Sequence, residues 1–136
     1  MNALNTYLDH TLLKADATSA DILAVTAEAK AYHTASVCVN TCFTALVARE
    51  LKGSGVKTCV VVGFPLGAMS SGAKAVEAAL AVREGAEEVD MVMSIGAAKA
   101  GDWASVQADI AAVVNAEKPA IVKVIIETCL FTDEEK

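Results

Sequence analysis

The stretch AIVKVIIE, residues 120–127, indicates the fold class because it places a charged side chain inside an apolar strand. Val and Ile dominate it, and runs of such β-branched residues are typical of strands buried in parallel sheets. Lys123 stands in the middle, and an ammonium group is costly to bury without a partner. The stretch therefore predicts a strand with one face that is polar at this position.

Four further runs of this kind come before it, at residues 7–13, 35–40, 57–63 and 87–93. Ala-rich stretches with helical spacing lie between the five runs, at residues 18–33, 42–51, 72–85 and 102–117. Such alternation predicts a parallel sheet covered by helices, either an open doubly wound sheet or a (β/α) barrel.

Composition narrows the class of protein. The chain has 136 residues, which predicts a single domain over residues 1–136. Its net charge of −6 argues against a nucleic-acid partner, since such proteins carry basic patches. No apolar run reaches the roughly 18 residues that span a bilayer, and the first residues lack the pattern of a signal peptide. We therefore expect a cytoplasmic protein without a membrane partner.

Three ionisable residues lie inside the predicted strands, namely Asp9, Asp90 and Lys123. Alternation along a strand allows all three to share one face of the sheet. On the inside of a barrel, near the carboxyl ends of the strands, they would form a site. Asp90 and Lys123 belong to consecutive strands and are predicted neighbours. The alternative is a structural ion pair without chemistry.

The placement of Lys123 suggests carbonyl chemistry on a barrel scaffold. A buried lysine beside a carboxylate serves imine formation, proton transfer or electrostatic stabilisation. The other lysines, Lys74 among them, are predicted to lie on the surface or in loops. The stretch GAMSSGAK, residues 67–74, is not a phosphate-binding P-loop, because Ala73 separates Gly72 from Lys74.

The histidines and cysteines predict no metal site. His10 and His33 are far apart in the sequence, and the spacing of Cys38 and Cys42 is not that of a zinc site. All four cysteines are expected to be reduced. Apart from Cys38, they are expected to serve as small, buried apolar residues.

Five motifs together resemble one family: LDHTLLK (8–14), SVCVN (36–40), VVGFPLGA (61–68), the segment 74–102 with EVDMV, and VKVIIETCLFTDEEK (122–136). In this order and spacing they resemble deoxyribose-phosphate aldolase, a class I aldolase. The resemblance implies a (β/α)₈ TIM barrel. It also implies cleavage of 2-deoxy-D-ribose 5-phosphate to glyceraldehyde 3-phosphate and acetaldehyde through a lysine Schiff base, with no cofactor and no metal.

The resemblance also assigns roles to single residues. Asp90 matches the aspartate of the family's proton relay, and Lys123 matches a lysine that lines the pocket on strand five. Asp9 and Thr11 match polar residues near the substrate hydroxyls, and Cys38 matches a pocket cysteine on strand two. Thr41 departs from the proline that is usual after Asn40, which affects only the local loop.

The resemblance covers five strands of the eight in such a barrel. The family's Schiff-base lysine lies on strand six, and its phosphate-binding loops follow strands seven and eight. We therefore expect a half-barrel fragment that is inactive alone. Activity would require the remaining strands, or Lys123 as the imine-forming residue. A third alternative is a scaffold without catalysis that forms homo-oligomers, because the first and fifth strands would be open edges.

Overall fold

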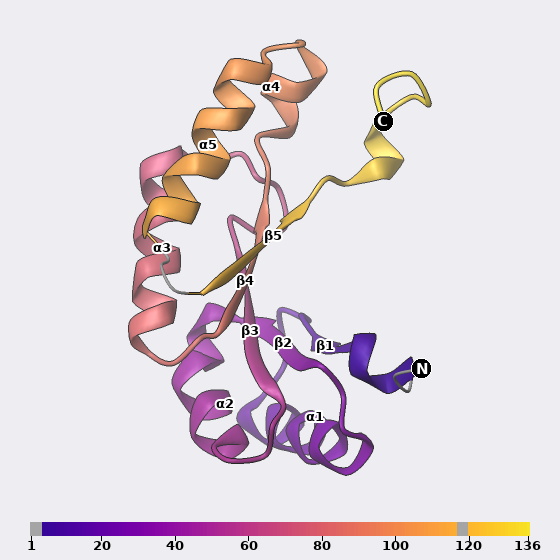
Figure 1. Cartoon of the computed structure of the whole chain (residues 1–136), viewed down its shortest axis with the longest axis vertical. Helices are drawn as coiled ribbons and strands as arrows, with labels where there is room; N and C mark the ends of the chain where they lie inside the picture. Colours follow the sequence, from indigo (N-terminus) through magenta and orange to yellow (C-terminus); the bar gives the residue numbers. More distant parts are fainter. Residues whose placement is uncertain (1–3, 117–119) are drawn as a thin grey trace.

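The computed structural model describes residues 4–116 and 120–136 and contains one parallel sheet (Figure 1). The strand order follows the sequence, β1-β2-β3-β4-β5. The strands are β1 (Asp9–Leu12), β2 (Ser36–Asn40), β3 (Lys57–Val62), β4 (Glu88–Val92) and β5 (Ile121–Ile125). All five predicted strands are present, each shorter than its apolar run by one to three residues.

Helices connect successive strands. They are α1 (Ser19–Tyr32), α2 (Thr44–Leu51), α3 (Ser71–Arg83), α4 (Ile95–Lys99) and α5 (Trp103–Ala116). Short 3₁₀ turns lie at Leu4–Tyr7, Thr41–Phe43 and Thr128–Leu130. The sequence pattern did not predict α4, which is a helix of five residues in the connection after β4.

Capping side chains fix where several helices begin. Thr18 caps α1, and its hydroxyl and backbone exchange hydrogen bonds with Asp21 in a capping box. The Asp102 carboxylate accepts a hydrogen bond from the backbone N–H of Ser105 at 3.0 Å, at the start of α5. The predicted end of this helix, before Pro119, lies outside the described residues.

The hydrophobic core lies between the sheet and the helices. One face of β2, β3 and β4 contributes valines and Met91, and the helices contribute Ile22, Val47, Ala78 and Val113, all of them fully buried. All the helices lie on this one side of the sheet (Figure 1). A doubly wound sheet has helices on both faces, whereas a barrel has them only outside. The fold is therefore an α/β arrangement of the barrel type, five strands of a partial TIM barrel.

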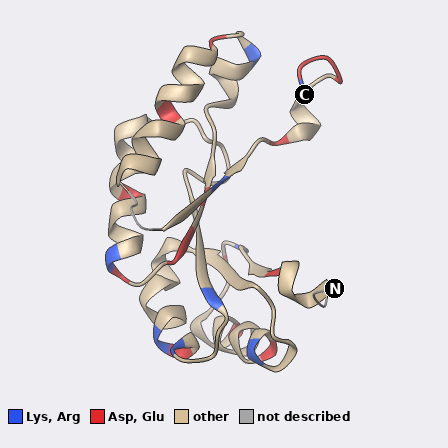
Figure 2. Ribbon diagram, viewed as in Figure 1, with Lys and Arg blue, Asp and Glu red and all other residues tan. Residues whose placement is uncertain are grey.

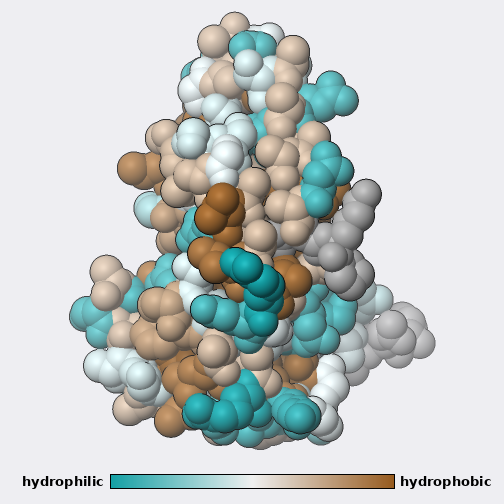
Figure 3. Space-filling model, turned by 90° about the vertical axis from the view of Figure 1, so that its left-hand side faces the viewer, coloured by the Kyte–Doolittle hydropathy of each residue, from teal (hydrophilic) through white to brown (hydrophobic). Residues whose placement is uncertain are grey.

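The opposite face of the sheet, called the inner face here, carries no helix among the described residues (Figure 1). The edge strands of the described sheet are β1 and β5. The helical side mixes hydrophilic and hydrophobic surface (Figure 3), and Val76 and Leu80 of α3 are exposed there. Within the described part of the chain, no helix has the length and apolar character that crossing a bilayer requires.

Candidate functional site

The register of the sheet gathers polar side chains on the inner face. Asp9 of β1 pairs with Ser36 of β2, and Asp90 of β4 pairs with Lys123 of β5. Register partners in a sheet point to the same side. Acidic and basic residues therefore meet at the middle of the sheet (Figure 2). The predicted common face of Asp9, Asp90 and Lys123 is confirmed.

Lys123 is the centre of this cluster. Its Nζ atom lies 2.7 Å from Asp9 Oδ2, 3.0 Å from Glu88 Oε2 and 3.2 Å from Asp90 Oδ1. The contact with Asp9 joins the first strand to the fifth, so it spans the concave side of the sheet. One ammonium group thus faces three carboxylates, with about a third of its side chain exposed.

This environment keeps Lys123 charged. Desolvation would lower the pKa of the ammonium, but the hydrogen bond to Asp9 and the nearby acidic groups outweigh it, so that the pKa is raised. An amine must lose its proton before it attacks a carbonyl carbon. The geometry therefore favours an electrostatic and positioning role for Lys123 over imine formation.

Asp9 and Glu88 are each kept ionised by hydrogen bonds from two donors. Burial would raise the pKa of Asp9, but hydrogen bonds from Lys123 and from Ser36, at 2.6 Å, outweigh it and the pKa is lowered. Burial would likewise raise the pKa of Glu88, and hydrogen bonds from Lys57, at 2.8 Å, and from Lys123 lower it. These two carboxylates therefore act as fixed negative charges.

Asp90 differs from its two neighbours. Its side chain is 16% exposed, and burial raises the pKa of the carboxyl despite the proximity of Lys123. The Oδ1 atom is shielded from solvent and accepts no hydrogen bond within the described residues. It interacts with Lys123 through the ion pair alone, at 3.2 Å. A carboxyl group with a raised pKa is suited to take up and return a proton.

The two remaining predicted site residues lie near the cluster in different ways. The Cys38 thiol donates toward Asp90 Oδ2 at 4.0 Å and is almost fully buried. Thr11 shares the face of Asp9, but its hydroxyl donates to the backbone carbonyl of Asp9 at 2.8 Å. The structure thus brings Cys38 to Asp90, whereas Thr11 lies on the edge strand with its hydroxyl bonded to the backbone.

Sequence reasoning missed three members of the cluster: Lys57, Cys59 and Glu88. Glu88 lies two positions before Asp90, so strand alternation places both on one face, a signal that could have identified it. Lys57 and Cys59 follow the same rule on β3, because the register aligns Lys57 with Ser36 and Cys59 with Cys38.

The surface position predicted for Lys74 is wrong. Lys74 is fully buried between α3, α5 and the end of β4, where Nζ lies 2.6 Å from Asp109 Oδ2 and 2.9 Å from the Val92 carbonyl oxygen. Lysine is almost never fully buried unless it is paired, so a sequence pattern places it on the surface by default. The pair lies on the helical side of the sheet, away from the inner face.

Comparisons with known proteins agree with this architecture. A family model described as DeoC/LacD family aldolase matches residues 4–136. The chain is 58% identical over 133 residues to the deoxyribose-phosphate aldolase of Finegoldia magna, covering 98% of this chain and 62% of that protein. It is 57% identical to the deoxyribose-phosphate aldolase of Clostridium novyi, covering 97% of this chain and 60% of that protein.

Among solved structures, the deoxyribose phosphate aldolase of Aeropyrum pernix, described as a unique tetramer, superposes with a TM-score of 0.87 at 31% identity. The match covers 97% of this chain and 56% of that one. The chain thus spans about 60% of the length of the curated relatives it matches. The parallel sheet in barrel order and the lysine among carboxylates on its inner face agree with these matches. Because the family model matches residues 4–136, the chain belongs to the DeoC/LacD family of aldolases.

Proposed function

We propose that this chain forms the first five strands of a deoxyribose-phosphate aldolase barrel and contributes one wall of its active site. The observation that carries the proposal is the cluster of Lys123 with Asp9, Glu88 and Asp90 on the inner face. The reaction would be the reversible cleavage of 2-deoxy-D-ribose 5-phosphate to glyceraldehyde 3-phosphate and acetaldehyde.

In this proposal the residues have different tasks. Asp90 carries a proton to and from the reacting carbon centre, since its pKa is raised by burial. Lys123 holds Asp90 in place and supplies positive charge beside the developing oxyanion. Asp9 and Thr11, on the more exposed part of the same face, bind substrate hydroxyls. Cys38 shapes the pocket wall next to Asp90.

The raised pKa of Lys123 supports the further proposal that the 136-residue chain does not form the imine itself. Trapping with borohydride in the presence of acetaldehyde, followed by peptide mapping, tests this point. We expect no adduct on Lys123, and an adduct there would assign imine chemistry to this half of the barrel.

A complementation experiment tests the activity. The chain is coexpressed with the part of the Finegoldia magna aldolase that it does not match, and cleavage of 2-deoxy-D-ribose 5-phosphate is measured. We expect activity in the mixture, a loss of at least about 100-fold with Asp90→Asn, and no change with the exposed control Lys52→Met. Equal activity of Asp90→Asn and the unmodified chain would refute the role of Asp90.

A second candidate, a scaffold that self-associates without catalysis, is favoured by the two open edges of the described sheet. Unpaired strand edges are templates for a second chain. Light scattering over a range of concentrations tests this candidate, and a mass fixed at the monomer value would exclude it.

A further inference from the structure

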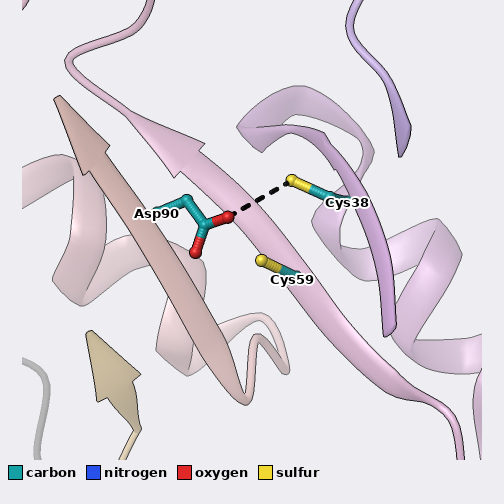
Figure 4. Close-up of side chains that lie close together, drawn as sticks. All are labelled: Cys38, Cys59 and Asp90. Atoms are coloured by element: carbon teal, nitrogen blue, oxygen red, sulfur yellow. Dashed lines mark hydrogen bonds between the residues drawn. The ribbon is translucent and has the colours of Figure 1, made fainter. Parts of the chain in front are cut away.

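Two thiols and a carboxylate converge on the inner face, beside the Lys123 cluster (Figure 4). Cys38 and Cys59 are register partners on the adjacent strands β2 and β3. The Asp90 side chain reaches them from β4, with Oδ2 at 4.0 Å from Cys38 Sγ. One ligand atom from each of the three residues lies within 4.8 Å of the other two.

We propose that Cys38, Cys59 and Asp90 form a binding site for a thiophilic divalent metal ion of the Zn²⁺ or Cd²⁺ type. Thiolate sulfur and carboxylate oxygen are ligands that zinc takes in proteins, and thiolates select soft ions over Mg²⁺ and Ca²⁺. The site goes beyond the proposed aldolase function, which uses no metal ion.

The geometry is close to what a tetrahedral ion needs. With Zn–S bonds of about 2.3 Å and Zn–O bonds of about 2.1 Å, the ligand atoms would be about 3.5 to 3.8 Å apart. The present separations of up to 4.8 Å therefore shorten by at most about 1.3 Å, within reach of side-chain rotation. Rigid neighbouring strands hold two of the ligands, and both cysteines are almost completely buried.

The fourth position is open to a small ligand. The Asp90 side chain is 16% exposed on a face that no described helix covers, so a water molecule has access to the ion. Three protein ligands with one open position are usual for zinc sites that are not purely structural.

Charge balance is compatible with the neighbouring Lys123. Binding replaces two thiol protons by one divalent ion, M²⁺ + 2 RSH → M(SR)₂ + 2 H⁺, so the net charge of the cluster is unchanged. Lys123 contacts Asp90 through Oδ1, whereas the ion would use Oδ2. The ammonium therefore keeps its ion pairs with Asp9 and Glu88 and does not have to leave.

Two exposed cysteines, Cys42 and Cys129, would complicate a binding experiment and are replaced first. The test titrates Cd²⁺ into the Cys42→Ser/Cys129→Ser chain in the presence of a phosphine reductant. The ultraviolet sulfur-to-cadmium charge-transfer band reports thiolate ligation. We expect one Cd²⁺ per chain, competition by Zn²⁺ and none by Mg²⁺.

Variants of the three ligands assign the site. In the same background, Cys38→Ser, Cys59→Ala and Asp90→Asn should each weaken Cd²⁺ binding by at least about tenfold. Cys59→Ala is chosen because it introduces no polar group at a fully buried position, and far-ultraviolet circular dichroism checks that each variant folds. The Lys52→Met variant, exposed at the end of α2 and far from the three ligands in the sequence, should bind Cd²⁺ as the background does.

Two results would overturn the inference. One is a charge-transfer band that is absent in the folded Cys42→Ser/Cys129→Ser chain. The other is a band that persists with unchanged affinity in Cys38→Ser and in Cys59→Ala. Because the readout is metal binding and not catalysis, a failure of the proposed aldolase activity would leave this result unaffected.

Discussion

The surroundings of Lys123 explain why this charged residue is tolerated within an apolar strand. On the inner face its single positive charge offsets part of the repulsion among three carboxyl groups at close range. The side chain remains about one-third exposed, so water screens part of each interaction. Removing it should therefore destabilise the protein moderately and leave the helical core intact.

The stability effect of Lys123→Met should depend on pH. In the unmodified protein the lowered pKa values of Asp9 and Glu88 add stability above their ordinary values of 3.8 and 4.5. That contribution is lost as the pH falls through the lower values in the folded state. We expect Lys123→Met to lower the free energy of unfolding by about 1–2 kcal/mol at pH 7, with a smaller loss at about pH 3. Urea denaturation at both pH values measures this difference, and an equal loss at both would contradict the explanation.

Asp90 should titrate above its ordinary value. Burial raises the pKa of the carboxyl above 3.8, and the charge of Lys123 limits the rise. The pKa should therefore rise further in Lys123→Met, because the opposing positive charge is gone. Carboxyl chemical shifts from NMR titration measure both values. A pKa of Asp90 that falls in Lys123→Met would contradict the assignment.

The sequence predicted part of this cluster. Asp90 and Lys123 stood out because each interrupts an apolar run, and a local pattern is sufficient to find such a residue. The contact of Lys123 with Asp9 depends on the curvature of the whole sheet, which local periodicity does not contain. Lys57 and Glu88 stand at the beginnings of their strands, where charged residues are usually exposed.

At the level of elements, α3 and α5 are joined to the sheet by a buried ion pair. Lys74 of α3 contacts both Asp109 of α5 and the Val92 carbonyl at the end of β4. Lysine is rarely buried completely, so sequence patterns place it on the surface by default. Its partner Asp109 is 35 residues away in the sequence, and nothing in the local pattern connects the two.

Removing only one partner of this pair should be severe. We expect Lys74→Met to lower the free energy of unfolding by about 3–5 kcal/mol, because Asp109 would remain buried without its counter-ion. The double variant Lys74→Met/Asp109→Leu should regain most of this loss. Urea denaturation measures the change.

A matched control is the exposed pair of Lys99 with Glu135, where Lys99→Met should change the free energy of unfolding by less than about 1 kcal/mol. If Lys74→Met and Lys99→Met were equally mild, water must reach Asp109 after the substitution, and the buried pair would not hold these elements together.

At the level of the whole molecule, the sequence predicted the order of the elements and the class of fold. The spacing of apolar runs was sufficient for five strands, since parallel strands need crossover connections of a dozen residues or more. It did not decide between a doubly wound sheet and a barrel. That choice depends on which side each helix packs, and here all of them pack on one side (Figure 1).

Self-association should depend on the inner face rather than on the helical side. Ile121 of β5 is 48% exposed on the inner face next to the open edge, and Val76 of α3 is 60% exposed on the helical side. If a second copy covers the inner face, a charge at Ile121 would be desolvated in the oligomer and would weaken it. We expect light scattering to give a mass above 14.0 kDa that rises with concentration. Ile121→Lys should shift this mass toward the monomer, whereas Val76→Lys should leave it unchanged. If Val76→Lys dissociated the oligomer and Ile121→Lys did not, the copies would meet through their helices, and the inner face would stay open to solvent and small molecules.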